Sequence, residues 1–294
     1  MSAEAGRKTM SRKAKVMLGL KVIILTILLV GIGRLALTVV GLKDAAQAAD
    51  PTGTIIGLFI ARALQVIVLS YVIIRSRWSG WRLVVTTFVV FYGIEVFLNH
   101  LEAVVFFQNF ANIIPAGRTP EMFLHGAITL ALFSPLAVLV HGKMKGAEEP
   151  QEPSLRLVMP WMVWTRRLIL IAVIYMVIYF LFAYFVAIPL AREAFEEYFH
   201  DVQTTNWMWI FPFQLLRGLL LTALAVPVIR MMKGRLWEAK LAVALLFSVI
   251  MAAGLLVPSD IMPDGIRMPH FVEIISSNFL FGWIVVWLLS RRHK

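Results

Sequence analysis

The sequence predicts an all-α polytopic membrane protein with eight transmembrane helices. Of its 294 residues, 60% are hydrophobic and 15% are charged, whereas soluble domains are about half apolar and a quarter charged. The mean hydropathy is +0.81. The apolar residues fall into eight runs, each close to the roughly 20 residues that an α-helix needs to cross a bilayer.

The predicted spans are joined mostly by short connections. In chain order they cover residues 17–40, 54–74, 83–107, 121–141, 167–190, 207–229, 237–257 and 269–290. The first run follows a basic segment, as the core of a signal peptide does, but it is far longer than the about 7–15 residues of such a core. We therefore interpret it as a retained first span.

Basic residues orient the spans. Lys and Arg gather before the first span and in segments 75–82, 143–167, 230–240 and 291–294. The loops on the other side contain only Lys43, Arg118, Arg192 and Arg267. The positive-inside rule places both termini in the cytoplasm. Short loops and the lack of an organelle signal favour the cytoplasmic (inner) membrane of a prokaryote.

A polar segment divides the chain. Residues 142–158 are rich in Pro and Glu, which predicts a cytoplasmic linker. It separates an N-terminal half, residues 1–141, from a C-terminal half, residues 159–294, and each half holds four spans.

The two halves show weak self-similarity. Residues 61–75 align without gaps on residues 216–230, which places Arg62 over Arg217. An even number of spans per half predicts parallel repeats, related by an axis along the membrane normal. The alternative is that two unrelated apolar helices with basic flanks can be aligned equally well.

Ionisable residues inside the spans are the candidate functional groups, because a charge at membrane depth costs at least ~2.5 kcal/mol and persists with a partner or a wet cavity. At 100° per residue, Glu95, Asn99 and Glu102 share one face of the third span. Arg62 and Arg217 lie at a depth similar to that of Glu95, about 12–18 Å from the nearest span end.

The predicted substrate-binding set is Arg62, Gln65, Glu95, Asn99, Gln214, Arg217, Glu273 and Asn278. These residues concentrate in the outer half of the membrane, which predicts a cavity that opens outward and no continuous polar path. Guanidinium forks bind planar anions. The alternative is that both arginines form structural salt bridges with Glu95 and Glu273.

A second set could hold a metal. His125, His270 and Glu273 are predicted near the outer side, and imidazole with carboxylate suits Zn, Mn or Fe. A chance spacing is the alternative, since His-x-x-Glu is a two-residue signal. A divalent metal is the one cofactor considered; haem is not expected, because no two histidines match in depth. The absence of Cys excludes thiolate sites.

These features predict a transporter, or a transport-complex subunit, for a small anionic solute, with Glu95 as the group that takes up a proton or cation. Two alternatives remain: a membrane-embedded enzyme that acts on a lipid or isoprenoid phosphate at the outer leaflet, and a non-catalytic partner subunit. The expected partners are membrane lipids, a solute or lipid substrate, and another protein or a second copy of the chain. A nucleic acid is not expected, because the basic residues flank apolar spans.

Overall fold

The computed structural model describes residues 11–42, 50–106, 118–146, 152–155, 157–192, 194, 207–258 and 262–291. These residues are almost entirely helical. Their other regular backbone pairing consists of two isolated bridges, Ser76 with Met232 and Pro153 with Lys233. The expectation of an all-α chain is confirmed.

The helices follow the predicted spans closely. The first half contains α1 (Arg12–Val40), α2 (Pro51–Ile74), α3 (Gly80–Phe91), η2 (Tyr92–Leu98), α4 (Asn99–Phe106) and α5 (Thr119–Val140). The second half contains α6 (Trp161–Phe182), η3 (Ala183–Ala187), α8 (Trp207–Met231), α9 (Leu236–Leu245), η4 (Leu246–Ile250), η5 (Ala253–Leu256) and α10 (Asp264–Ser290). Among the described residues, seven helical stretches are long and apolar enough to cross a membrane. The remaining predicted span, 237–257, which is the seventh in chain order, is also helical but is interrupted where α9 gives way to η4 and η5.

Local sequence signals explain several helix ends. The Ser11 hydroxyl accepts a hydrogen bond from the Ala14 N–H (3.2 Å), and Asp50 Oδ1 accepts one from the Gly53 N–H (2.9 Å), so both side chains cap helix N-termini. Gly41 ends α1 with a φ of 73°, which glycine adopts at little cost. The fifth span begins at Trp161, earlier than the predicted residue 167, because Pro160 occupies its N-cap.

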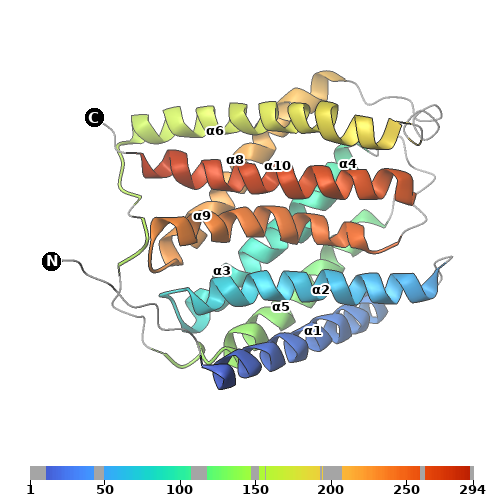
Figure 1. The fold of residues 1–294 in the computed structure, drawn as a ribbon, viewed down its shortest axis with the longest axis vertical. Coiled ribbons are helices and arrows are strands. Elements are labelled where there is room, and N and C mark those ends of the chain that lie inside the picture. Colours follow the sequence, from blue (N-terminus) through green and yellow to red (C-terminus); the bar gives the residue numbers. More distant parts are fainter. Residues whose placement is uncertain are drawn as a thin grey trace.

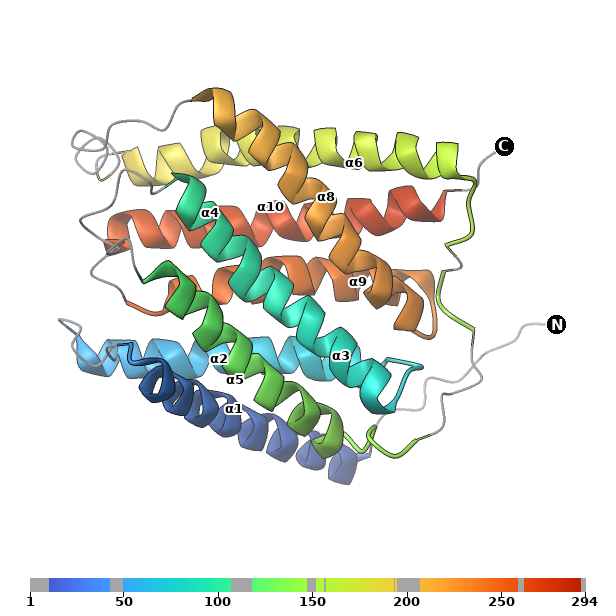
Figure 2. The same ribbon diagram turned by 180° about the vertical axis from the view of Figure 1, so that it is seen from behind.

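The helices form two layers, which Figures 1 and 2 show from opposite sides. In one layer α6, α10, α9 and α2 lie side by side, and in the other α8, α3 with α4, and α5 cross them diagonally. α1 packs against both α2 and α5 at the edge. One layer has the order α6–α10–α9–α2, and the other has the order α1–α5–α3–α8. In each layer the first, fourth and third spans of one half therefore follow one another and are joined by the second span of the opposite half.

The connections at one end of the bundle are paired with each other. α1 begins and α10 ends at this end (Figure 1), which we call the basic end because Arg75, Lys143 and Lys233 lie there. The Arg77 N–H donates to the Met231 carbonyl (2.7 Å) and the Lys233 N–H to the Arg75 carbonyl (3.0 Å). The connection after α2 and the connection after α8 therefore run antiparallel and join the halves.

A histidine near the same end is held neutral. Burial, together with the nearby positive charge of Lys21, lowers the pKa of His141 to about 4. His141 Nε2 shares a hydrogen bond of 3.0 Å with the Ser70 hydroxyl. At neutral pH this imidazole is therefore uncharged and serves as a packing and hydrogen-bonding group between α2 and the end of α5.

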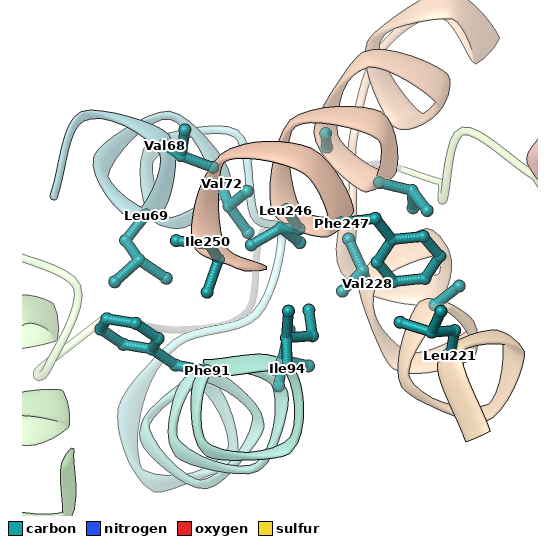
Figure 3. Close-up of a cluster of buried hydrophobic side chains, with 14 of the residues drawn as sticks. Val68, Leu69, Val72, Phe91, Ile94, Leu221, Val228, Leu246, Phe247 and Ile250 are labelled. Atoms are coloured by element: carbon teal, nitrogen blue, oxygen red, sulfur yellow. The ribbon is translucent and has the colours of Figure 1, made fainter. Parts of the chain in front are cut away.

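The centre of the molecule is apolar. Figure 3 shows side chains of α2, α3, η2, α8 and η4 meeting between the two layers, with Leu69 and Val72 on one side and Leu221 and Val228 on the other. Phe91, Ile94, Leu246 and Ile250 are buried between them. The third span of each half contains a π-helical segment here, η2 in one and η4 in the other. This core separates the polar groups described below from the basic end.

Candidate functional site

A cavity lies between α4, α6, α8 and α10, toward the end of the bundle opposite the basic end. Its lining residues are Glu102, Tyr175, Ile178, Tyr179, Arg217, His270, Glu273, Ile274, Ser277 and Asn278. The free space is small, with room for about one water molecule. Both halves of the chain contribute: α4 belongs to the first half, and the other three helices belong to the second.

Arg217 is the cation of the cavity. It lies ten residues into α8, about 15 Å from the helix start, and its side chain is only 3% exposed. It forms a salt bridge with Glu102 of α4, so a charge pair links the two halves. Its Nη2 also contacts the Met251 sulfur at 3.2 Å, which is a weak acceptor. Because a guanidinium has five N–H donors, a buried arginine with one carboxylate partner can bind a further anion.

α10 contributes an acid–base pair. His270 and Glu273 are three residues apart, which places them on one helix face, and His270 Nδ1 lies 2.7 Å from Glu273 Oε2. Glu273 is buried. Hydrogen bonding through Nδ1 fixes the orientation of the ring, as a carboxylate does for the histidine of a general acid–base pair. The next turns of the same face carry Ser277 and Asn278.

Several buried polar atoms near the cavity have no hydrogen-bond partner among the described residues. They are Arg217 Nε, Asn278 Oδ1 and both amide atoms of Gln214. Gln214 is fully buried and lies three residues before Arg217 on α8. Buried polar groups are almost always satisfied in native proteins. Arg217 and Asn278 line the cavity, so a water molecule or a polar ligand there would form the missing hydrogen bonds with Arg217 Nε and Asn278 Oδ1.

A second polar cluster lies around α2 and the interrupted span of the second half. Arg62 forms a salt bridge with Glu95 of η2 and donates to Gln65 Oε1 (2.8 Å). Gln65 Nε2 donates to the Ile250 carbonyl (3.4 Å), and Asn99 Nδ2 donates to the Met251 carbonyl (3.2 Å). These carbonyls lie where η4 ends, so the amides satisfy backbone groups that an irregular helix inside a membrane leaves free.

The predicted site residues thus divide between two places. Arg217, Glu273 and Asn278 line the cavity together with His270. Arg62, Gln65, Glu95 and Asn99 form the second cluster, and Gln214 is buried beside Arg217 without lining the cavity. Arg62 pairs with Glu95, whereas Arg217 pairs with Glu102 and not with Glu273.

The predicted metal set is not brought together. His125 Nε2 lies 3.1 Å from the Gly33 carbonyl on α1, so its ring contacts a different neighbour from the helices that hold His270 and Glu273. Among the residues that the structure describes, no three His, Asp or Glu side chains are grouped as metal ligands. The described residues therefore contain no group of three ligands for the metal-dependent enzyme that the sequence offered as an alternative.

The predicted site residues did not include six residues that line the cavity: Glu102, Tyr175, Ile178, Tyr179, Ile274 and Ser277. Glu102 was placed on the face of Glu95, but Glu95 lies inside η2, whose i→i+5 turns rotate the residues that follow away from the α-helical 100° spacing. Glu95 therefore forms its salt bridge with Arg62 of α2, and Glu102 forms its salt bridge with Arg217 of α8. The two tyrosines lie four residues apart in an apolar run, a spacing that predicts a shared face but not what it faces.

Comparison with known proteins identifies no relative: no family model, no curated protein and no solved structure matches the chain. The function is therefore inferred from the geometry of the cavity.

Proposed function

We propose that the protein is a membrane transporter, or the membrane subunit of a transport complex, that binds a small anionic solute in the cavity around Arg217 and couples its movement to protons. The observation that carries the proposal is the buried Arg217 guanidinium, which lies in a cavity built by both halves and is neutralised by Glu102. An intramembrane ionisable residue indicates a functional site by default.

The charge balance of the cavity supports proton coupling. The cavity holds the guanidinium of Arg217, the carboxylates of Glu102 and Glu273, and the imidazole of His270, which is paired with Glu273. An anion that entered alone would add an uncompensated negative charge to a buried site, which is very costly. An anion that enters together with a proton leaves the net charge of the cavity unchanged.

The irregular helices around the cavity support a role in which the bundle changes shape. Glu102 lies on α4, which directly follows the π-helical η2, Pro212 lies inside α8 before Arg217, and the third span of the second half ends in η5. Broken and kinked helices next to a midplane site are typical of transporters. The apolar core in Figure 3 closes the path from the cavity to the basic end, as expected for a state that opens outward.

We further propose that the chain is a duplicated four-helix unit with parallel repeats. The two layers share one order of helices, and η2 and η4 begin at Tyr92 and Leu246 in equivalent spans. The aligned segments 61–75 and 216–230 lie in α2 and α8, the pair of helices that is exchanged between layers. An axis between η2 and η4 would relate the halves, with the antiparallel connections at the basic end around it.

The proposed orientation places the basic end in the cytoplasm of a prokaryotic cell, by the positive-inside rule. The chain contains no Cys, so single cysteines report their location without background. Thr52 and Lys145 are exposed at opposite ends. In intact cells a membrane-impermeant maleimide should label Thr52→Cys, and it should label Lys145→Cys only after permeabilisation. The reverse pattern would invert the orientation.

The proposed transport is tested in proteoliposomes that contain a pH-sensitive dye. Pyruvate, phosphate and chloride are added outside one at a time, and proton movement is followed. We expect at least one anion to drive proton movement in the wild-type protein, and Arg217→Gln to abolish it, because the neutral amide cannot bind an anion in a buried site.

Arg118→Gln is the matched control, because Arg118 forms an exposed ion pair with Glu121 and such pairs contribute little. It should transport as the wild type does. Proton movement that is the same in protein-free liposomes, or that survives Arg217→Gln, would contradict the proposed function.

The hydrogen-bonded His270 and Glu273 favour one other candidate, a membrane-embedded enzyme that uses this pair for acid–base chemistry on a lipid or isoprenoid phosphate. Release of phosphate from a prenyl phosphate in detergent, lost in His270→Gln and accompanied by no anion-driven proton movement, would establish the enzyme in place of the transporter.

A further inference from the structure

We propose that Glu102 is an internal competitor for the solute: its carboxylate occupies the place on Arg217 that the carboxylate of a small monocarboxylate takes during transport, and Glu102 carries the proton that is moved with it. This inference rests on the proposed function and adds to it the class of the solute, the group that releases the binding site and the group that is protonated.

The arrangement around Arg217 indicates a carboxylate as the preferred ligand. Within the described residues, Glu102 is the carboxylate with which Arg217 pairs. Arg217 Nη2 also contacts the Met251 sulfur, and Arg217 Nε has no hydrogen-bond partner in the described part of the chain. A guanidinium presents five N–H donors in a planar fork that matches a carboxylate, so donors remain for a second carboxylate or for one that binds by both oxygens.

Glu102 is placed so that it can leave. Its side chain is 18% exposed, whereas that of Arg217 is 3% exposed. It lies on the short helix α4, close to the end of the bundle and directly after the irregular η2. By contrast, Glu95 pairs with an arginine that also donates to Gln65, in a cluster joined to the backbone of η4. The salt bridge of Arg217 is therefore the one that borders the cavity and can open into it.

The ionisable groups that face Glu102 determine what its release requires. α8 contributes Arg217, α6 contributes Tyr175 and Tyr179, and α10 contributes His270 and Glu273. α5, which packs against the other side of α4, contributes no residue to the cavity. Glu273 is bonded to His270. A displaced Glu102 carboxylate would thus lose its arginine partner and lie beside the His270–Glu273 pair, with no further arginine in the cavity lining, and protonation removes the charge that would be left unpaired.

The exchange balances in charge and atoms. Before it, the Arg217 cation is paired with the Glu102 carboxylate, and a solute carboxylate and a proton are outside. After it, Arg217 is paired with the solute carboxylate and Glu102 is a neutral carboxylic acid. One ion pair breaks, one forms, and one O–H bond forms on Glu102. Release of the solute on the other side reverses each change.

The test measures binding of radiolabelled pyruvate to purified protein between pH 5.5 and 7.5. For wild type, we expect the dissociation constant to fall by up to about tenfold for each unit by which the pH falls, because one proton binds with each anion. Glu102→Gln keeps the shape of the side chain but cannot be protonated. It should bind pyruvate more tightly than wild type at pH 7.5 and show no dependence on pH. Glu102→Asp keeps a titratable carboxyl group and should keep the dependence.

Two results would overturn the inference while leaving the proposed function standing. One is proton movement driven by phosphate or chloride but not by pyruvate and abolished by Arg217→Gln, which would make the solute another anion. The other is a pH dependence that persists in Glu102→Gln and disappears in Glu273→Gln, which would make Glu273 the protonated group. Loss of anion-driven proton movement for every anion would instead contradict the proposed function itself.

Discussion

Replacement of Arg217 by Met is expected to lower the free energy of unfolding by about 3–5 kcal/mol, the cost of removing one partner of a buried salt bridge. Methionine preserves much of the apolar volume of the side chain, so the main change is that Glu102 loses its cation. The measurement is equilibrium unfolding of the purified protein in detergent micelles, followed by far-UV circular dichroism.

The matched control removes both charges. Arg217→Met combined with Glu102→Gln should recover most of the lost stability, because buried ion pairs contribute little relative to neutral groups that fill the same space. The difference between the double variant and the sum of the two single variants gives the coupling energy. A double variant as unstable as Arg217→Met alone would show that the arginine stabilises the fold through packing and not through Glu102.

Arg62 provides an internal comparison. Its salt bridge with Glu95 has side chains that are 20% and 16% exposed, against 3% for Arg217. Better solvation lowers the cost of an unpaired charge. Arg62→Met should therefore destabilise the protein less than Arg217→Met does, although the two arginines occupy aligned positions in the two halves.

The spans were predictable from the sequence because their signal is local. Each is an apolar run of the length that a bilayer requires, and residues such as Pro51 and Gly41 mark where helices begin and end. The same locality made Arg217, His270 and Glu273 visible, since a charge in an apolar run stands out from its neighbours. What such a residue contacts depends on other helices, and no local pattern contains that information.

The errors have physical causes of the same kind. Glu102 was misplaced because a π-helical segment changes the angular spacing of every later residue in the span, and apolar composition does not reveal where η2 lies. His125 was grouped with His270 by depth alone, whereas its ring bonds to the Gly33 carbonyl of α1. The exchange of α2 and α8 between the layers is a long-range arrangement that span order does not predict.

Gly282→Ala is expected to lower the free energy of unfolding by about 1–3 kcal/mol, as overpacking in a close-packed interior does. α10 and α9 touch through their backbones here. A Cβ atom at Gly282 would lie 2.7 Å from Ala244 Cα and 2.9 Å from the Val243 carbonyl oxygen. No side-chain rotation can relieve these contacts, so the helices must separate. Unfolding in detergent micelles, as for Arg217→Met, measures the loss.

Gly31→Ala is the control, because a Cβ atom at Gly31 on α1 meets nothing within 4 Å. It should be neutral or stabilising by up to about 1 kcal/mol, the usual gain when Ala replaces Gly in a helix. The change at Gly282 should also reach the cavity. Phe281 lies between Phe247 of η4 and Tyr175 of the cavity, with ring centroids 6.0 and 4.7 Å away. Separation of α9 from α10 would shift this aromatic contact and the helix that carries His270 and Glu273. Pyruvate binding that weakens in Gly282→Ala and not in Gly31→Ala would tie the packing of the bundle to the site, whereas equal binding in both variants would confine the effect to stability.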